Sequence, residues 1–178
     1  MTESGLPEPW LRGTLTDVAV VPRAALHALE LARIDLQYWC GSLTDQELNL
    51  EFEGIAPVAF HLRHIAGSIE RLLTYAEGRE LGATQIAALK SERLAGATRQ
   101  QLFAALDASL ERAAERIRAL GADGLDQVRT VGIKKLPTTV GGLLVHVADH
   151  TQRHVGQAVT TAKFVRALPH LKSDPARG

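Results

Sequence analysis

Hydrophobic positions recur every three or four residues along most of the chain, which is the spacing of one face of an amphipathic α-helix. The pattern predicts four long helices, over about 18–40, 57–76, 98–120 and 139–167, the last beginning at Thr138 or Thr139. Thr44 and Glu47 have capping-box spacing, which predicts a short helical turn after the first helix. The segment 122–137 shows only a short extended piece near 128–133. The predicted fold class is therefore all-α, a four-helix bundle with a long connection between its third and fourth helices.

The predicted inward faces differ in chemistry. Those of the first and third helices are hydrophobic: Val21, Ala25, Leu29, Ala32, Leu36 and Trp39, and Leu102, Leu106, Leu110, Ala113 and Ile117. Those of the second and fourth also carry histidines: Phe60, His61, His64, Ile65, Ser68, Leu72 and Tyr75, and Leu143, His146, Val147, His150, His154 and Ala158. A buried imidazole needs partners for its nitrogens, so packing alone accounts poorly for five histidines on two inward faces.

Length and composition narrow the class of protein. The 178 residues suit one domain, expected over 1–178 with a core at 18–167 and a loose tail at 168–178. Twenty basic residues balance twenty acidic ones, which argues against a chain that coats nucleic acid or an anionic membrane. No secretory signal is visible, and the longest uncharged segment, 136–148, is too short to span a bilayer. We expect a cytoplasmic protein that binds neither nucleic acids nor membranes.

The single cysteine, Cys40, excludes an internal disulfide framework and a cysteine-based zinc cluster. Its position at the end of the first helix predicts a core residue. His27 and His170 lie away from the two histidine segments, and we interpret them as bystanders. The chemistry is therefore expected at the remaining five histidines.

In the fourth helix, His146, His150 and His154 are each four residues apart and lie on one stripe. Two histidines at this spacing can place imidazole nitrogens on one metal ion. Zinc–nitrogen bonds are about 2.0–2.1 Å long, whereas His146 and His154 are about 12 Å apart along the helix axis. The pair is therefore either His146 with His150 or His150 with His154.

A third ligand must come from another helix, and the second helix offers His61 and His64. One of them, facing the fourth helix, would complete a three-histidine site. Catalytic metal centres keep three protein ligands and one open position, because water or substrate must occupy the fourth.

Three segments resemble the DinB superfamily of DinB/YfiT-like metalloenzymes. Residues 149–157 (DHTQRHVGQ) resemble its last-helix motif, a histidine pair followed by Gly-Gln, and residues 60–65 (FHLRHI) resemble its second-helix motif. Residues 43–49 (LTDQELN) resemble the acidic segment between its first two helices. The resemblance extends over about 18–165.

Carried over to this chain, the resemblance implies metal ligands at His64, His150 and His154. His61 and His146 would then line the pocket, as proton shuttles or as partners of the ligands. The resemblance also implies that Gly156 allows close helix approach and that Gln157 hydrogen-bonds near the site. Members of the superfamily bind divalent metals such as zinc or nickel.

Characterised members of the superfamily include thiol-dependent S-transferases and isomerases. The expectation is a metal-dependent enzyme acting on a small molecule, either an S-transferase with a low-molecular-weight thiol as co-substrate or a hydrolase. The alternative is a non-catalytic metal-binding or dimerising bundle, with four closed ligands if His61 joins His64. Pairing into a homodimer through helix faces suits bundles of this class.

Overall fold

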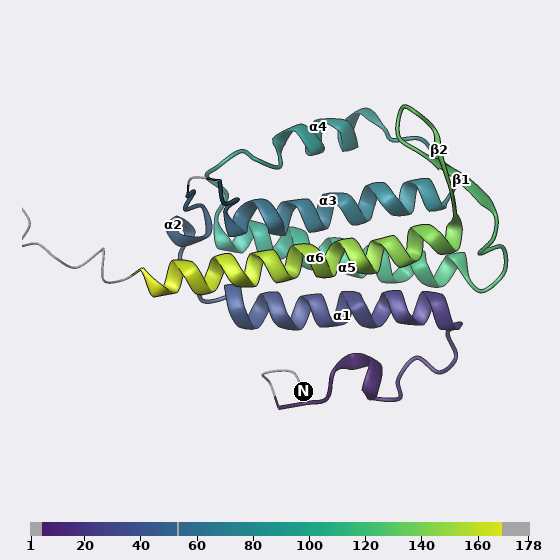
Figure 1. Cartoon of the computed structure of the whole chain (residues 1–178), viewed down its shortest axis with the longest axis horizontal. Coiled ribbons are helices and arrows are strands. Elements are labelled where there is room, and N and C mark those ends of the chain that lie inside the picture. The colour runs from purple at the N-terminus through teal and green to yellow at the C-terminus, as the bar shows by residue number, and fades with distance from the viewer. Residues whose placement is uncertain (1–4, 53, 169–178) are drawn as a thin grey trace, which may run out of the picture.

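The computed structural model of the chain describes residues 5–52 and 54–168. These residues are mostly helical (Figure 1), with α1 (Val20–Cys40), α2 (Asp45–Leu48), α3 (Val58–Ala76), α4 (Ala83–Ser91), α5 (Arg99–Leu120) and α6 (Val140–Ala167), a 3₁₀ helix η1 (Pro9–Leu11), and two strands, β1 (Val128–Val131) and β2 (Leu136–Thr139). The four long helices lie side by side, as the hydrophobic periodicity predicts. The all-α expectation is confirmed, with one small sheet added.

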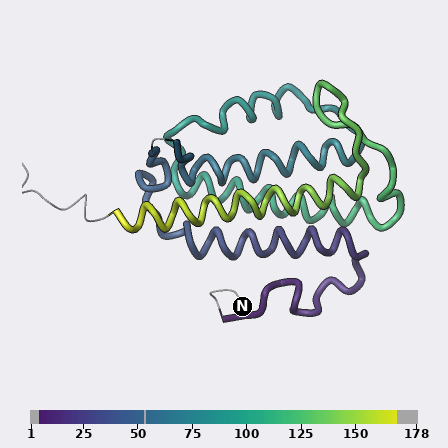
Figure 2. The backbone as a smooth tube through the Cα atoms, in the orientation of Figure 1, coloured from purple at the N-terminus to yellow at the C-terminus, as the bar shows by residue number. Residues whose placement is uncertain are grey.

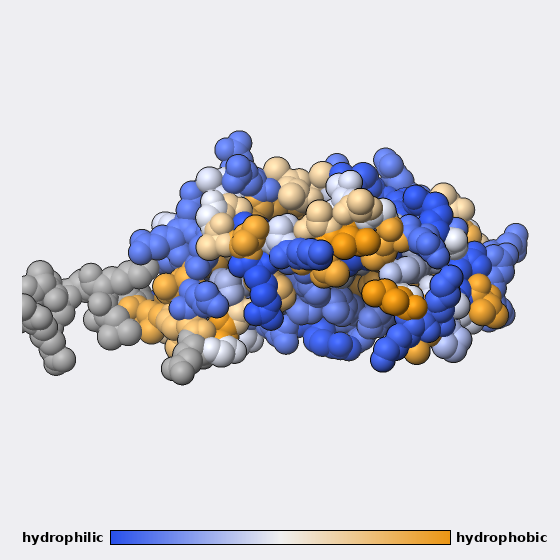
Figure 3. All heavy atoms as spheres, turned by 90° about the horizontal axis from the view of Figure 1, so that it is seen from above, coloured by the Kyte–Doolittle hydropathy of each residue, from blue (hydrophilic) through white to orange (hydrophobic). Residues whose placement is uncertain are grey.

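The directions of the long helices explain a segment that the sequence pattern leaves unassigned. Helices α1 and α6 run in one direction, and α3 and α5 run in the other (Figure 2). The chain must therefore travel back along the molecule between α3 and α5, and α4 lies on this return, over α3. Periodicity does not predict α4, because it contributes no buried side chain. Its Ile86 and Leu89 are exposed. The side of the molecule that carries α4 shows hydrophobic and hydrophilic groups mixed together (Figure 3).

The hydrophobic core lies among the long helices. The predicted inward face of α5 is buried throughout, and so are Ala25, Leu29, Ala32 and Leu36 of α1. In α3 the predicted face is only partly right, because Leu62, Ile69 and Leu73 are buried while Leu72 and Tyr75 are half-buried. Helix α3 contacts α4, α5 and α6, so it is covered over a wider arc than one stripe.

Two predicted helix starts have the expected caps. The Thr44 side chain accepts a hydrogen bond from the backbone N–H of Glu47. In return, the carboxylate of Glu47 accepts a hydrogen bond from the backbone N–H of Thr44. The Thr139 hydroxyl accepts a hydrogen bond from the N–H of Gly142 at the start of α6. Each cap satisfies backbone donors that a helix start leaves unpaired, so the sequence fixes where α2 and α6 begin.

The long connection before α6 contains an antiparallel hairpin. Strand β1 is the expected extended piece and pairs with β2 from Val128 opposite Thr139 to Val131 opposite Leu136. The sequence pattern did not predict β2, which contains Pro137. The proline is tolerated there because β2 pairs with a neighbour on one side only. Of the expected tail, residues 169–178, including His170, lie outside the described residues. No helix among the described residues has the length and apolar character needed to cross a membrane.

Candidate metal centre

Three partly buried histidines meet where α3 packs against α6. Helix α3 provides His64, and α6 provides His150 and His154 one turn apart. Each offers one ring nitrogen, and these three atoms all lie within 4.8 Å of one another. The Nε2 atoms of His64 and His150 are 2.9 Å apart. Two nitrogens on one tetrahedral zinc ion are about 3.3 Å apart, given bonds of about 2.0–2.1 Å. The group, hereafter the histidine cluster, therefore has the size of a site for one ion.

His146 lies outside the histidine cluster. Its side chain is 47% exposed, and its Nδ1 lies 3.8 Å from a carboxylate oxygen of Asp149. Each four-residue step on a helix turns the side chain by about 40°, so His146 is about 80° from His154. The expectation that all three histidines of α6 lie on the buried face is therefore wrong for His146. Its ring still lies beside that of His150, with 5.3 Å between centroids.

His61 is buried next to the histidine cluster without belonging to it. Its side chain contacts His154, with 3.1 Å between the two Nδ1 atoms. This contact fits a tautomer in which Nδ1–H of His154 donates to His61. The Nε2 lone pair of His154 then stays available, which is the arrangement that metal-bound histidines adopt.

The sequence analysis missed a carboxylate behind His64. Glu92, the residue after α4, accepts a hydrogen bond from Nδ1 of His64, at 2.7 Å. Its other oxygen accepts one from the guanidinium of Arg71, at 2.6 Å. Glu92 and Arg71 are both buried. The Nδ1–H···carboxylate bond fixes the ring of His64 and leaves its Nε2 lone pair facing His150, as a metal ligand requires.

The surroundings of His61, His150 and His154 favour neutral imidazoles. Burial, reinforced by repulsion from neighbouring histidines, lowers the pKa of His61 and of His150 to about 4. Burial also lowers the pKa of His154. Burial acts to raise the pKa of Glu92, but hydrogen bonds from His64 and Arg71 outweigh it and hold that pKa below its ordinary value. Metal ligation needs deprotonated imidazole nitrogens, so the residues present fit a divalent cation.

Comparison with known families agrees with this geometry. A model of the DinB superfamily matches residues 28–158. The chain belongs to the DinB superfamily. The match includes the histidine cluster, His61 and His146. No curated protein sequence matches the chain.

In this DinB-superfamily chain a cavity of about 860 Å³ adjoins the histidine cluster. It lies between the start of α3, the segment after α4, and α6, and it is lined by Gly54, Ile55, Ala56, Phe60, His61, Arg93, Arg153, His154, Gly156, Gln157, Thr160 and Thr161. Gln157 lines this cavity, and its expected hydrogen bond near the site stays a prediction. Gly156 does not serve close helix approach, because a methyl group there would meet no atom within 4 Å.

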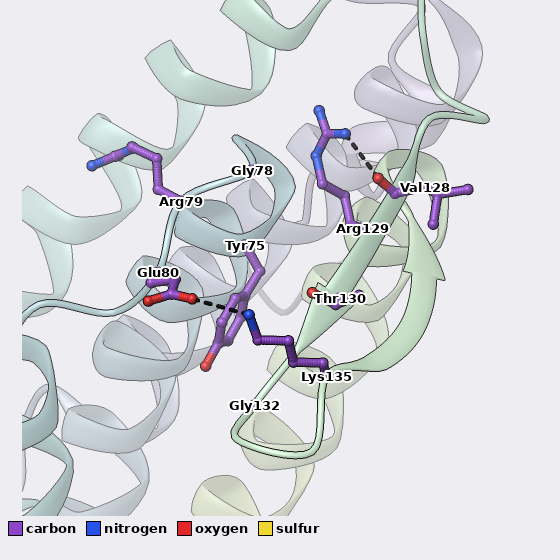
Figure 4. Close-up of a pocket in the computed structure, with 9 residues that line it drawn as sticks. All are labelled: Tyr75, Gly78, Arg79, Glu80, Val128, Arg129, Thr130, Gly132 and Lys135. Carbon is purple, nitrogen blue, oxygen red and sulfur yellow. Dashed lines mark hydrogen bonds and ion pairs between the residues drawn. The ribbon is translucent and has the colours of Figure 1, made fainter.

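A second cavity, of about 370 Å³, lies between the end of α3 and the hairpin (Figure 4). Its basic groups already have partners: Lys135 pairs with Glu80, Arg79 pairs with Glu77, and Arg129 donates to backbone carbonyls. None of its lining residues belongs to the histidine cluster. Of these two cavities, the one lined by His61 and His154 is therefore the one that adjoins the histidine cluster.

The predicted bystanders lie elsewhere. His27 is buried in α1, where its Nε2 lies 3.2 Å from the hydroxyl of Thr14. Cys40 is fully buried, and burial raises the pKa of its thiol to about 12. Such a thiol stays protonated and is a poor nucleophile. The prediction that Cys40 is a core residue is confirmed.

Proposed function

We propose that the protein is a divalent-metal-dependent enzyme whose ion is held by His64, His150 and His154. The observation that carries the proposal is the convergence of their three ligand nitrogens within 4.8 Å of one another. Membership of a superfamily of metal-binding proteins supports it. The all-nitrogen donor set suits zinc or nickel.

The surrounding residues prepare these ligands. Glu92 orients His64 through Nδ1, and His61 orients His154 when Nδ1–H of His154 donates a hydrogen bond to it. A divalent ion in this site would lower the pKa of a bound water or thiol and polarise an electrophile. His146 is exposed beside His150, so it can exchange a proton between the site and solvent. We assign the proton-shuttle role to His146, and a positioning role to His61, whose low pKa keeps it neutral.

Two reaction classes fit this arrangement. In an S-transferase, a low-molecular-weight thiol is the nucleophile and the cavity holds the electrophilic small molecule. In a hydrolase, water takes the place of the thiol. Three neutral histidines leave the positive charge of the ion uncompensated, which favours an anionic nucleophile in either case.

The alternative is a non-catalytic metal-binding or dimerising bundle. The observation that favours it is the closeness of His61 to His154, since a fourth imidazole could close the coordination shell. The two functions differ in one respect that can be measured. An enzyme keeps one position open, whereas a structural site has four protein ligands.

Cobalt(II) distinguishes them, because its visible spectrum responds to a change of ligand. The purified chain is loaded with cobalt and titrated with azide, alongside a His61→Ala variant. For the enzyme, azide changes the spectrum of the wild-type protein, and His61→Ala retains the ion. A spectrum insensitive to azide, together with loss of the ion in His61→Ala, would establish the closed site instead.

We also propose the domain organisation, cellular location and oligomeric state of the protein. The chain forms a single DinB-like four-helix-bundle domain over 1–178, with its core at 18–167, and acts in the cytoplasm as a homodimer on a small-molecule substrate. The antiparallel and parallel packing of α1, α3, α5 and α6 supports the bundle. Exposed hydrophobic side chains at the hairpin, such as Ile133 and Leu136, support self-association. Sedimentation equilibrium tests the dimer.

A further inference from the structure

We infer that the cavity beside the histidine cluster binds an organic anion, with Arg93 recognising its negative group. The inference rests on the proposed function, since it names the substrate class of the same site. The cavity is within the range of roughly 300–1,000 Å³ that is typical of small-molecule sites. His61 and His154 form part of its wall, so a molecule bound there reaches the cluster.

The charges of the cavity point to an anion. Its described lining residues include two arginines, Arg93 and Arg153, and no aspartate or glutamate. Arg153 is already engaged, because its guanidinium lies 2.6 Å from the carboxylate of Asp149. Arg93 has no carboxylate partner among the described residues. Its guanidinium therefore keeps its donors available for a carboxylate, phosphate or similar group.

Arg93 is placed for this role by its neighbours. Its guanidinium lies over the ring of Phe60, with 5.2 Å to the centroid. Phe60 in turn stacks on His64, with 5.3 Å between centroids and 20° between ring planes. The preceding residue, Glu92, is anchored to His64 and Arg71. The segment after α4 thus fixes His64 with one side chain and provides a cation to the cavity with the next.

The other lining residues indicate the chemistry of the rest of the ligand. Ile55, Ala56 and Phe60 are hydrophobic, whereas Gln157 and Thr160 offer polar groups along α6. A ligand with an apolar body and an anionic end would place the body against Phe60 and Ile55 and the charge against Arg93. A cation would meet Arg93 with no described carboxylate in the cavity to offset the repulsion.

The test compares two probes of equal size, hexanoate and hexanamide, by NMR titration of the full chain. It is carried out on metal-free protein and repeated with zinc, so that anion binding at Arg93 is separated from binding to the ion. We expect hexanoate to bind metal-free protein about tenfold more tightly than hexanamide, the order of one charge-assisted hydrogen bond. The amide shifts should concentrate at Phe60, His154 and Gln157.

Arg93→Gln should abolish the preference for hexanoate, and Arg93→Lys should retain part of it. Arg118→Gln, which removes the same charge at the far end of α5, should leave the preference unchanged. Equal binding of the two probes, no binding of either, or a preference that survives Arg93→Gln would overturn the inference. A preference seen only with zinc and insensitive to Arg93→Gln would overturn it while leaving the metal site intact. Absence of metal binding would contradict the proposed function separately, because the selectivity is read without metal.

Discussion

Gly67 of α3 gives the carboxylate of Glu92 the space it needs behind His64. A methyl group at Gly67 would lie 2.6 Å from Oε1 of Glu92 and 2.7 Å from Nη1 of Arg71. Both distances are too short for a carbon atom in van der Waals contact. The glycine is required by the close approach of these side chains.

Gly67→Ala should therefore move Glu92 away from His64 without unfolding the protein, because the displaced atoms are the ends of flexible side chains. We expect zinc affinity to fall about 10- to 100-fold, the typical effect of losing a partner behind a metal ligand. The matched control is Gly156→Ala, another helical glycine, where a methyl group meets no atom within 4 Å. Competition with a zinc chelator measures both variants, and equal affinities would contradict the role of Gly67.

Removing the charge of Glu92 should affect stability and metal affinity separately. Glu92→Gln leaves the buried guanidinium of Arg71 without its counter-charge, and losing one partner of a buried ion pair costs about 3–5 kcal/mol. The double variant Arg71→Met with Glu92→Leu should regain much of this stability, since no charge stays buried. Its zinc affinity should be lower than that of the wild-type protein, because leucine offers Nδ1 of His64 no acceptor. Urea unfolding and zinc titration test this, and full recovery of zinc affinity would show that Glu92 is only structural.

The metal-free protein should lose stability as the pH falls from about 6.5 to about 4. His61 and His150 have native pKa values of about 4, against 6.5 for an ordinary histidine. The unfolded chain therefore binds more protons in this window, and protonation favours unfolding, by up to about 1.4 kcal/mol per pH unit for each group. Urea unfolding at several pH values measures the slope.

His61→Leu should reduce the dependence of unfolding free energy on pH by up to about 1.4 kcal/mol per pH unit, the contribution of one proton. The same substitution at His27, which is buried and whose Nε2 lies beside the hydroxyl of Thr14, provides the comparison. An unchanged slope in His61→Leu would show that His61 is not held neutral in the native state.

Cys40 should react with thiol reagents only when the protein unfolds. Its thiol is buried, and its pKa is raised to about 12 from 9.0. Because of this shift, the contribution of Cys40 to stability is fully present below about pH 9 and declines above it, where only the unfolded chain releases the thiol proton. Labelling with a chromogenic disulfide, with and without denaturant, tests the prediction. Rapid labelling of the native protein would contradict it.

The sequence predicted the parts of this structure that depend on local pattern. The long helices follow from hydrophobic periodicity, because each buries a stripe against its neighbours. Helix α4 buries no side chain, so no stripe marks it. Strand β2 contains a proline, and its pairing with β1 depends on a turn at 132–135 rather than on its own composition.

The same distinction applies to the site. The spacing of His150 and His154 indicated a metal pair, but spacing alone could not separate it from His146 with His150. The family resemblance selected His150 and His154, and the rotation of α6 explains the difference, because it turns His146 toward solvent. Glu92 and Arg93 were missed because they reach the site through the return path of the chain, 28 or more residues after His64. No local spacing encodes such a contact.

Calorimetric titration of zinc into the metal-free chain tests the central claim most directly. The account predicts one ion per chain in the wild-type protein and in His27→Ala. It predicts a zinc affinity more than about a hundredfold lower in His64→Ala, His150→Ala and His154→Ala. This loss exceeds the one expected when a residue that only hydrogen-bonds a metal ligand is removed. One ion bound with unchanged affinity in these three variants would contradict the assignment of the histidine cluster as the metal site.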